Sequence, residues 1–185
     1  MTAMMAVCMV AAHDEAWFRH LYAEAYRPLL AYARRRVDAA TAAEVVADTL
    51  LTAWRRRDDV PEGSERLWLF GVARNMIRNA TRSSRRRQAA HDRLRFVRPA
   101  EADETVAPEV GERSTLITAA LAALSEADRE VLMLVAWEEL SHAEIGQVLG
   151  ISANASAIRV HRARKRLAAR LDRLGDASAG EGSAS

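Results

Sequence analysis

Basic side chains crowd one short stretch near the end of the chain, where residues 159–173 hold seven lysines and arginines. Such side chains neutralise phosphates, and an arginine can also donate two hydrogen bonds to a guanine edge. The residues before them fit a short helix, because Ser141 and Glu144 match a capping box and Gly150 can take the positive φ that ends a helix. Ser152 can cap a second, basic helix. The pattern predicts a helix-turn-helix, whose second helix lies in the DNA major groove; the alternative is an αα-hairpin with a solvated basic face.

A second basic stretch lies earlier in the chain. Residues 74–98 hold nine arginines and a single acid, Asp92, whereas residues 101–112 hold five acids. The formal net charge is only +2, so the two signs are segregated along the chain. Two basic blocks separated by an acidic spacer indicate two separate contacts with a polyanion. The alternative is that both blocks simply reflect an arginine-rich composition.

Other classes of function find little support in the residue types. Cys8 is the only cysteine, the five histidines lack metal-ligand spacing, and neither a Ser-His-Asp order nor a phosphate-binding glycine loop occurs. We therefore expect no catalytic residue, no metal and no cofactor. No stretch approaches the roughly 18 consecutive apolar residues of a membrane span, and the apolar opening makes a poor signal peptide. The expected location is the cytoplasm, without membrane insertion.

The apolar residues recur with helical spacing along most of the chain, and alternating β-branched runs are almost absent. We therefore expect an all-α protein. One helix is expected over residues 13–37, interrupted or restarted at Pro28. Thr41 and Glu44 form a second capping-box candidate at the start of the next helix.

The helical pattern fails in the acidic stretch, which also contains Pro99, Pro108 and Gly111. This break predicts two small helical domains joined by a flexible linker. The tail after Leu174 has almost nothing to bury and is predicted to be disordered. The predicted divisions are a poorly ordered N-terminal extension at 1–13, a first domain at 14–88, the acidic flexible linker at 89–113, a second domain at 114–174 and the tail at 175–185.

Four motifs follow one another along the chain: AAEVVADTLLTAW at 42–54, WLFGVARN at 68–75, LAALSEADREVL at 121–132 and VHRAR at 160–164. Together they resemble the extracytoplasmic-function (ECF) subfamily of bacterial RNA polymerase sigma factors, over roughly residues 16–171. The resemblance implies a region 2 domain that binds the β′ clamp helices and opens the promoter −10 element. It also implies a region 4 domain that binds the β flap and reads the −35 element.

This resemblance makes core RNA polymerase, promoter DNA and an anti-sigma factor the expected partners. The residues alone leave a second reading open, in which the chain is a free-standing helix-turn-helix regulator. Residues 14–87 would then serve for dimerisation or ligand binding, and the chain would bind paired half-sites on duplex DNA by itself.

The resemblance places polymerase binding on the helix at residues 42–54. A mixed acidic and apolar face there would suit a basic coiled coil, with the acids giving orientation and burial giving affinity. Glu44 could instead be the acid of the capping box. The residues assigned to polymerase binding are Glu44, Val45, Asp48 and Leu51.

Promoter opening is assigned by the resemblance to the next helix. Asn75 matches the pocket for a flipped base, since an amide both donates to and accepts from a base edge. Residues 57–64 lie where the family captures a base, although an ordinary surface loop is the alternative. Trp68 is expected in the core. The residues assigned to −10 recognition and melting are Asn75, Arg78, Asn79, Arg82, Arg85, Arg86 and Arg87.

Reading of the −35 element falls to the second helix of the helix-turn-helix. Arg162 could pair bidentately with guanine, the commonest specific contact. Ala157 stands where many family members have Lys or Arg, and NAS at 154–156 replaces a frequent Gly-Thr-Val. These departures predict fewer polar base contacts. The residues assigned to −35 recognition are Ala157, Ile158, Arg159, His161, Arg162, Arg164 and Arg166.

Overall fold

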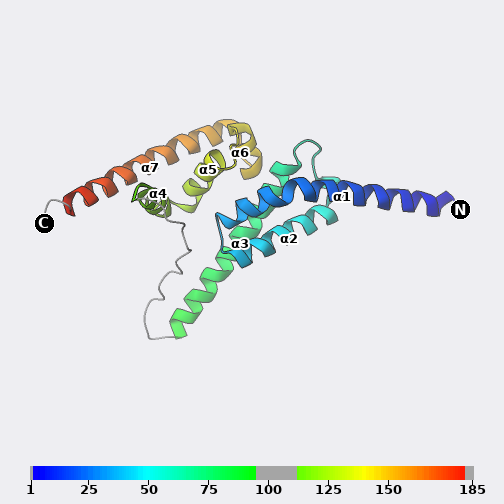
Figure 1. The fold of residues 1–185 in the computed structure, drawn as a ribbon, viewed down its shortest axis with the longest axis horizontal. Coiled ribbons are helices and arrows are strands. Elements are labelled where there is room, and N and C mark those ends of the chain that lie inside the picture. The colour runs from blue at the N-terminus through cyan, green and yellow to red at the C-terminus, as the bar shows by residue number, and fades with distance from the viewer. Residues whose placement is uncertain (1, 95–111, 182–185) are drawn as a thin grey trace. The chain divides into compact units, whose positions relative to one another are not determined.

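The computed structural model describes residues 2–94 and 112–181, which form seven α-helices and one 3-10 helix and contain no strand (Figure 1). The all-α prediction is therefore confirmed for this part of the chain. The helices belong to two compact units that divide between Glu101 and Ala102. The predicted linker at 89–113 lies for the most part outside the described residues.

The first unit is a bundle of three long helices, each of which contacts the other two (Figure 1). Each helix buries one apolar stripe, as its helical spacing of apolar residues predicts. At the centre, the rings of Tyr32 and Phe70 stack with their centroids 4.9 Å apart. The elements are α1 (Thr2–Arg34), α2 (Ala39–Arg55), the 3-10 turn η1 (Arg57–Asp59) and α3 (Glu65–Leu94).

Helix α1 runs without a break through Pro28, so the predicted interruption there is wrong. A proline inside a helix removes one N–H donor and crowds an earlier carbonyl, at a cost of about 3 kcal/mol. Leu29 and Tyr32, on the same turn and the next, are almost completely buried, and this packing offsets the cost. The helix begins at Thr2, so its backbone includes most of the predicted extension at 1–13.

Helix α2 is capped by Asp38, so the predicted capping box at Thr41 and Glu44 is wrong. The backbone N–H of Thr41 donates to Asp38 Oδ1 at 2.9 Å, and the Thr41 hydroxyl donates to Oδ2 at 2.7 Å. These hydrogen bonds, the backbone one first, lower the pKa of the Asp38 carboxyl. Glu44 is exposed on the second turn and has no role in the cap.

The second unit packs three short helices against one long one, α7, which contacts all of the others (Figure 1). Its largest fully buried side chains include Leu134, Ile145 and Val160. Ser125 caps α5, since its side chain accepts a hydrogen bond from the Asp128 N–H. The elements are α4 (Glu112–Ala122), α5 (Glu126–Ala136), α6 (His142–Leu149) and α7 (Ala153–Glu181).

Two helices extend past the predicted domain ends. Helix α3 runs to Leu94, beyond residue 88, and α7 runs to Glu181, into the tail predicted to be disordered. Adding a residue to an existing helix forms a further hydrogen bond without a new nucleus, so a long helix continues beyond its last core contact. None of the helices within 2–94 and 112–181 is long and apolar enough to cross a membrane.

Candidate nucleic-acid interface

Helices α6 and α7 form the predicted helix-turn-helix, and its local hydrogen bonds follow the predicted pattern. The Ser141 N–H donates to Glu144 Oε2 at 2.8 Å, and the Glu144 N–H donates to Ser141 Oγ at 3.3 Å. Gly150 ends α6 in the left-handed region, with φ at 67°. The Ala155 N–H then donates to Ser152 Oγ at 3.1 Å at the start of α7. Both helix ends are thus fixed by residues that are neighbours in sequence.

The turn is also fixed by a close approach at Gly146, inside α6. A Cβ on this glycine would lie 2.7 Å from the carbonyl oxygen of Ile151, which follows the turn. The Ile151 N–H in turn donates to the Gly146 carbonyl at 2.9 Å. Any larger residue would push the chain after the turn away from α6, so this glycine determines how closely the turn packs on α6.

Most residues predicted to read the −35 element lie on the solvent side of α7. Its inner face consists of Ser156, Val160 and Ala163, which are buried. Ala157 is half-buried, beside the inner face. The predicted residues that are exposed are Ile158, Arg159, His161, Arg162, Arg164 and Arg166. The helix therefore presents basic and apolar side chains together, as a major-groove surface requires.

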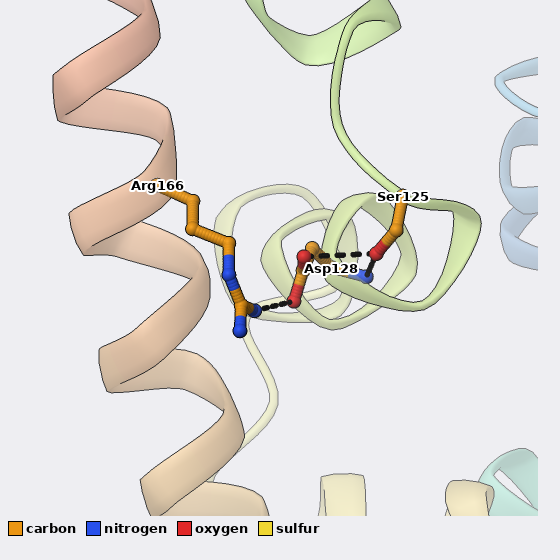
Figure 2. A network of polar contacts seen from close by, with 3 residues as sticks. All are labelled: Ser125, Asp128 and Arg166. Atoms are coloured by element: carbon orange, nitrogen blue, oxygen red, sulfur yellow. Dashed lines mark hydrogen bonds and ion pairs between the residues drawn. The ribbon is translucent and has the colours of Figure 1, made fainter.

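Arg166 of α7 is held by a contact to a different helix, α5 (Figure 2). Its Nη1 lies 2.7 Å from Asp128 Oδ1, and the other Asp128 oxygen accepts the Ser125 hydroxyl at 2.8 Å. The Asp128 side chain is only 16% exposed, against 57% for Arg166. Arg166 thus links α7 to the first turn of α5, a contact that the sequence reading did not identify.

Arg129 joins two helices of the same unit and was also missed. Its guanidinium donates to the carbonyls of Leu121 at 3.0 Å, Ala122 at 2.7 Å and Leu124 at 3.3 Å. These carbonyls lie at the end of α4, where helical partners run out. A cation there also complements the helix dipole. Arg129 therefore fixes the α4–α5 corner and is not available for DNA.

Of the residues predicted to open the −10 element, Asn75, Arg78, Asn79 and Arg82 lie on the outward side of α3, and the arginines at 85–87 follow them as a consecutive run around the helix. Leu69, Ala73 and Ile77 form the opposite, buried side. Residues 66–91 contain no acidic residue, so this part of α3 carries an excess of positive charge along its sequence. Arg78 is half-buried, and the exposed members of the set are Asn75, Asn79, Arg82, Arg85, Arg86 and Arg87.

The loop before α3 has a defined internal structure. Arg56 Nε lies 2.9 Å from Asp59 Oδ2, and the Gly63 N–H donates to Glu65 Oε1 at 2.9 Å, with Gly63 at φ 73°. Trp68 is half-buried and not part of the closed core, which corrects the expectation for this residue. The Arg56 guanidinium lies 5.9 Å from the centroid of the Trp68 ring, so Trp68 lies beside the residue that precedes the loop.

Helix α2 places the residues predicted to bind polymerase on two different sides. Glu44, Asp48 and Leu51 are exposed at positions i, i+4 and i+7, and Leu51 is 42% exposed despite being apolar. Val45 is buried in the core, so it cannot contribute to this surface and its assignment is corrected. One residue along a helix is a rotation of about 100°, which carries Val45 to the inner face.

Trp54 continues this face of α2 and was not among the predicted residues. It is an exposed large side chain, and its ring packs edge-on against Phe18 of α1 with centroids 5.2 Å apart. Aromatic pairs of this geometry hold both rings in place. Among the described side chains, at residues 14–87 and 116–174, no three of His, Cys, Asp or Glu are grouped as metal ligands.

Two family models match the chain. The model for Sigma-70 region 2 matches residues 21–87, and the model for Sigma-70 region 4 matches residues 114–167. The first match covers α2, the loop and most of α3, and the second covers the helix-turn-helix. Each match therefore lies within one of the two compact units.

Individual relatives agree with this result. The ECF RNA polymerase sigma factor SigL of Mycobacterium tuberculosis is 35% identical over 175 residues, which cover 93% of this chain and 98% of the relative. The RNA polymerase sigma factor CnrH of Cupriavidus metallidurans is 34% identical over 145 residues, which cover 70% of this chain and 72% of the relative.

Solved structures with similar folds include sigma factors bound to other proteins. CnrH in complex with the cytosolic domain of CnrY superimposes with a TM-score of 0.60 at 28% identity, covering 89% of this chain and 96% of the other. The sigma factor RpoE from Bartonella quintana, in complex with the anti-sigma factor NepR, superimposes with a TM-score of 0.62 at 25% identity. The match covers 84% of this chain and 96% of the other. The chain therefore belongs to the ECF family of RNA polymerase sigma factors, which direct promoter-specific initiation of transcription.

Proposed function

We propose that this sigma factor uses three separate exposed faces: α2 for core polymerase, α3 with its loop for the −10 element, and α7 for the −35 element. The observation that carries this division is the exposure pattern of the helices. In each of them the buried positions form one stripe, and the predicted contact residues lie outside it, with Val45 as the exception. Each face thus lies outside the buried stripe of its helix.

The α2 face, formed by Glu44, Asp48, Leu51 and Trp54, is proposed to dock on the β′ clamp helices. Two acids give orientation and rate toward a basic partner. Leu51 and Trp54 supply apolar area that is exposed in the free protein and would be buried in the complex. Aromatic and apolar anchors of this kind dominate binding energy in protein interfaces.

On α3, Asn75 is proposed to bind a base flipped out of the −10 element, while Arg82 and the arginines at 85–87 follow backbone phosphates. Melting then requires no catalysis. Unstacked bases gain contacts that the closed duplex lacks, so binding favours the open form. The loop at residues 57–64 is proposed to hold a second unstacked base.

On α7, Arg162 is proposed to pair with a guanine, and Ile158 to contact a thymine methyl group. Arg159 and Arg164 contact phosphates. The neighbouring positions are apolar, since Ile158 is exposed and Ala157 is half-buried. Few polar side chains therefore remain to contact bases, and Arg162 is proposed to read few −35 base pairs. Region 4 is also proposed to contact the β flap.

CnrH and RpoE were solved with other proteins bound, in the second case an anti-sigma factor. We propose that this chain likewise has an anti-sigma partner. It acts as a specificity subunit without enzymatic activity, in the cytoplasm where core polymerase and promoters are found.

The test of this proposal is binding of fluorescently labelled chain to purified bacterial core RNA polymerase, with an unlabelled housekeeping sigma factor as competitor. Leu51→Ala is expected to weaken binding about fivefold to tenfold, as loss of an apolar anchor does. Tyr22→Ala is the matched control, because Tyr22 is similarly exposed, at 45%, but lies on α1 of the same unit and outside the proposed α2 face. Absence of competable binding, together with specific duplex binding by the chain alone, would favour a free-standing regulator instead.

A further inference from the structure

An ion pair joins helix α1 to the start of the loop that precedes α3. Arg57 Nε lies 3.0 Å from Asp14 Oδ2, and the two side chains are 36% and 20% exposed. Asp58 Oδ1 is 4.0 Å from the same nitrogen, but that side chain is 92% exposed, so Asp14 is the nearer and better shielded partner. Shielding from water and salt makes such a pair stronger than one at the open surface.

A second contact supports the first at the same place. Phe18 lies one helical turn after Asp14 on α1, and Trp54 lies three residues before Arg57 at the end of α2. The Phe18 and Trp54 rings pack edge-on with centroids 5.2 Å apart. An aromatic contact and an ion pair, one helical turn apart on α1, therefore join α1 to the end of α2 and the start of the loop.

The residues after Arg57 depend on where Arg57 is placed. The Asp59 N–H donates to the Arg56 carbonyl at 2.9 Å, and the Val60 N–H donates to the Arg57 carbonyl at 3.2 Å. Further along, the Ser64 N–H donates to the Pro61 carbonyl at 3.1 Å. The loop is thus a chain of short-range hydrogen bonds that begins at the two arginines, of which Arg57 is anchored to α1.

We propose that Asp14 is a positioning residue for promoter recognition, which holds the loop at 57–64 in its binding conformation through Arg57. This inference rests on the proposed function of the loop. A loop that is ordered before it meets a single-stranded base loses less conformational entropy on binding, so its affinity is higher. Asp14 touches no DNA itself; its effect passes through the Arg57 side chain and the η1 turn.

The test uses the full chain, alone and as holoenzyme with core polymerase. Four variants are compared: Asp14→Arg, Arg57→Asp, the charge-swapped double variant, and Glu15→Gln as control. Glu15 pairs with Arg19 on the same helix, 2.6 Å away, and carries the same charge as Asp14, but its pair lies within α1. Circular dichroism first establishes that all variants keep their helix content.

The first readout is hydrogen exchange of the loop amides in the free protein, which involves no DNA. Each single variant is expected to speed exchange of the Asp59 and Val60 amides about threefold, the size expected for a partly exposed ion pair. The charge swap is expected to restore slow exchange, and Glu15→Gln to leave it unchanged. Unchanged exchange in the single variants, or no recovery in the swap, would overturn the inference.

The second readout is the rate of promoter opening, on a duplex selected from a randomised library by the wild-type holoenzyme. The single variants should open it about threefold more slowly, with recovery in the swap. A variant with residues 58–62 replaced by glycine and serine separates the two proposals. If it opens promoters normally, the proposed role of the loop is wrong. If it is impaired while Asp14→Arg and Arg57→Asp are not, the positioning role of Asp14 is wrong.

Discussion

Arg166 Nη1 lies 2.7 Å from Asp128 Oδ1, so a basic residue of the recognition helix is bound to the first turn of α5 (Figure 2). Asp128 sits three residues after the cap Ser125, where a negative charge is favourable near a helix N-terminus. The same carboxylate therefore serves the cap of one helix and the placement of another. Arg166 therefore ties α7 to α5 through an ion pair.

Arg166→Ala is expected to lower the free energy of unfolding of the second unit by about 0.5–1 kcal/mol, the range for a partly exposed pair. Urea-dependent hydrogen exchange of α5 and α7 peptides measures this change. Arg164→Ala is the control, because Arg164 is exposed on the same helix. Equal effects of the two substitutions would show that the Asp128 contact contributes nothing.

Gly146→Ala should destabilise the second unit more strongly, by about 1–3 kcal/mol, because overpacking at a close contact forces the backbone to shift. The added Cβ would meet the Ile151 carbonyl oxygen at 2.7 Å. Thermal unfolding measures the loss, with Gln147→Ala, exposed on the next position of α6, as a neutral control. A neutral Gly146→Ala would mean that the turn can move without cost.

Arg162→Ala is expected to cost about 1–3 kcal/mol in promoter binding and to relax selectivity at one −35 base pair. A phosphate contact such as the one proposed for Arg164 should instead weaken all sequences alike and reduce the salt dependence. Binding of the holoenzyme to promoters that vary at each −35 position measures both effects. Uniform weakening by Arg162→Ala would exclude direct base reading by this residue.

Asn75→Ala is expected to impair promoter opening more than closed-complex binding, since an unpaired base is available to Asn75 only after the duplex opens. Permanganate footprinting reports the melted thymines, and band-shift titration reports the closed complex. Asn79→Ala, on the same exposed side of α3, tests whether the effect belongs to position 75. Normal melting with Asn75→Ala would contradict the proposed base pocket.

The lowered pKa of Asp38 makes the stability of the first unit depend on pH. A carboxyl whose folded pKa is depressed stabilises the fold fully above its ordinary pKa and loses that contribution as pH falls through the folded value. Asp38→Asn keeps an acceptor for the Thr41 N–H but has no charge to titrate. The stability difference between wild type and Asp38→Asn, from thermal unfolding at several pH values, should therefore shrink toward acid pH. A constant difference would contradict this account.

Features fixed by neighbours in sequence were predictable. The capping box at Ser141, the positive φ of Gly150 and the Ser152 cap all depend on residues three or four positions away. Local patterns can also compete, however. Asp38 and Thr41 have the same cap-to-third-residue spacing as Thr41 and Glu44, and the structure uses the earlier pair. Nothing in the two patterns themselves decides between them.

Features fixed by tertiary packing were not predictable in this way. Val45 and Leu51 are both apolar residues of α2, and only the contacts with α1 and α3 determine which one is buried. The partner of Arg166 lies 38 residues earlier in the chain, and the passage of α1 through Pro28 depends on burial of the flanking turns. Periodicity predicts that a helix has an inner face, but long-range contacts select the residues of that face.

The two compact units belong to one chain, and each buries its own core. A promoter-bound holoenzyme therefore holds its DNA at the −10 and −35 elements through two units that are covalently connected. Once one unit has bound, the other experiences a high effective concentration of its own element, so two individually weak contacts yield a long-lived complex. The same linkage makes promoter choice depend on the spacing of the two elements. A promoter with two good elements at the wrong separation would engage only one unit at a time and lose this avidity.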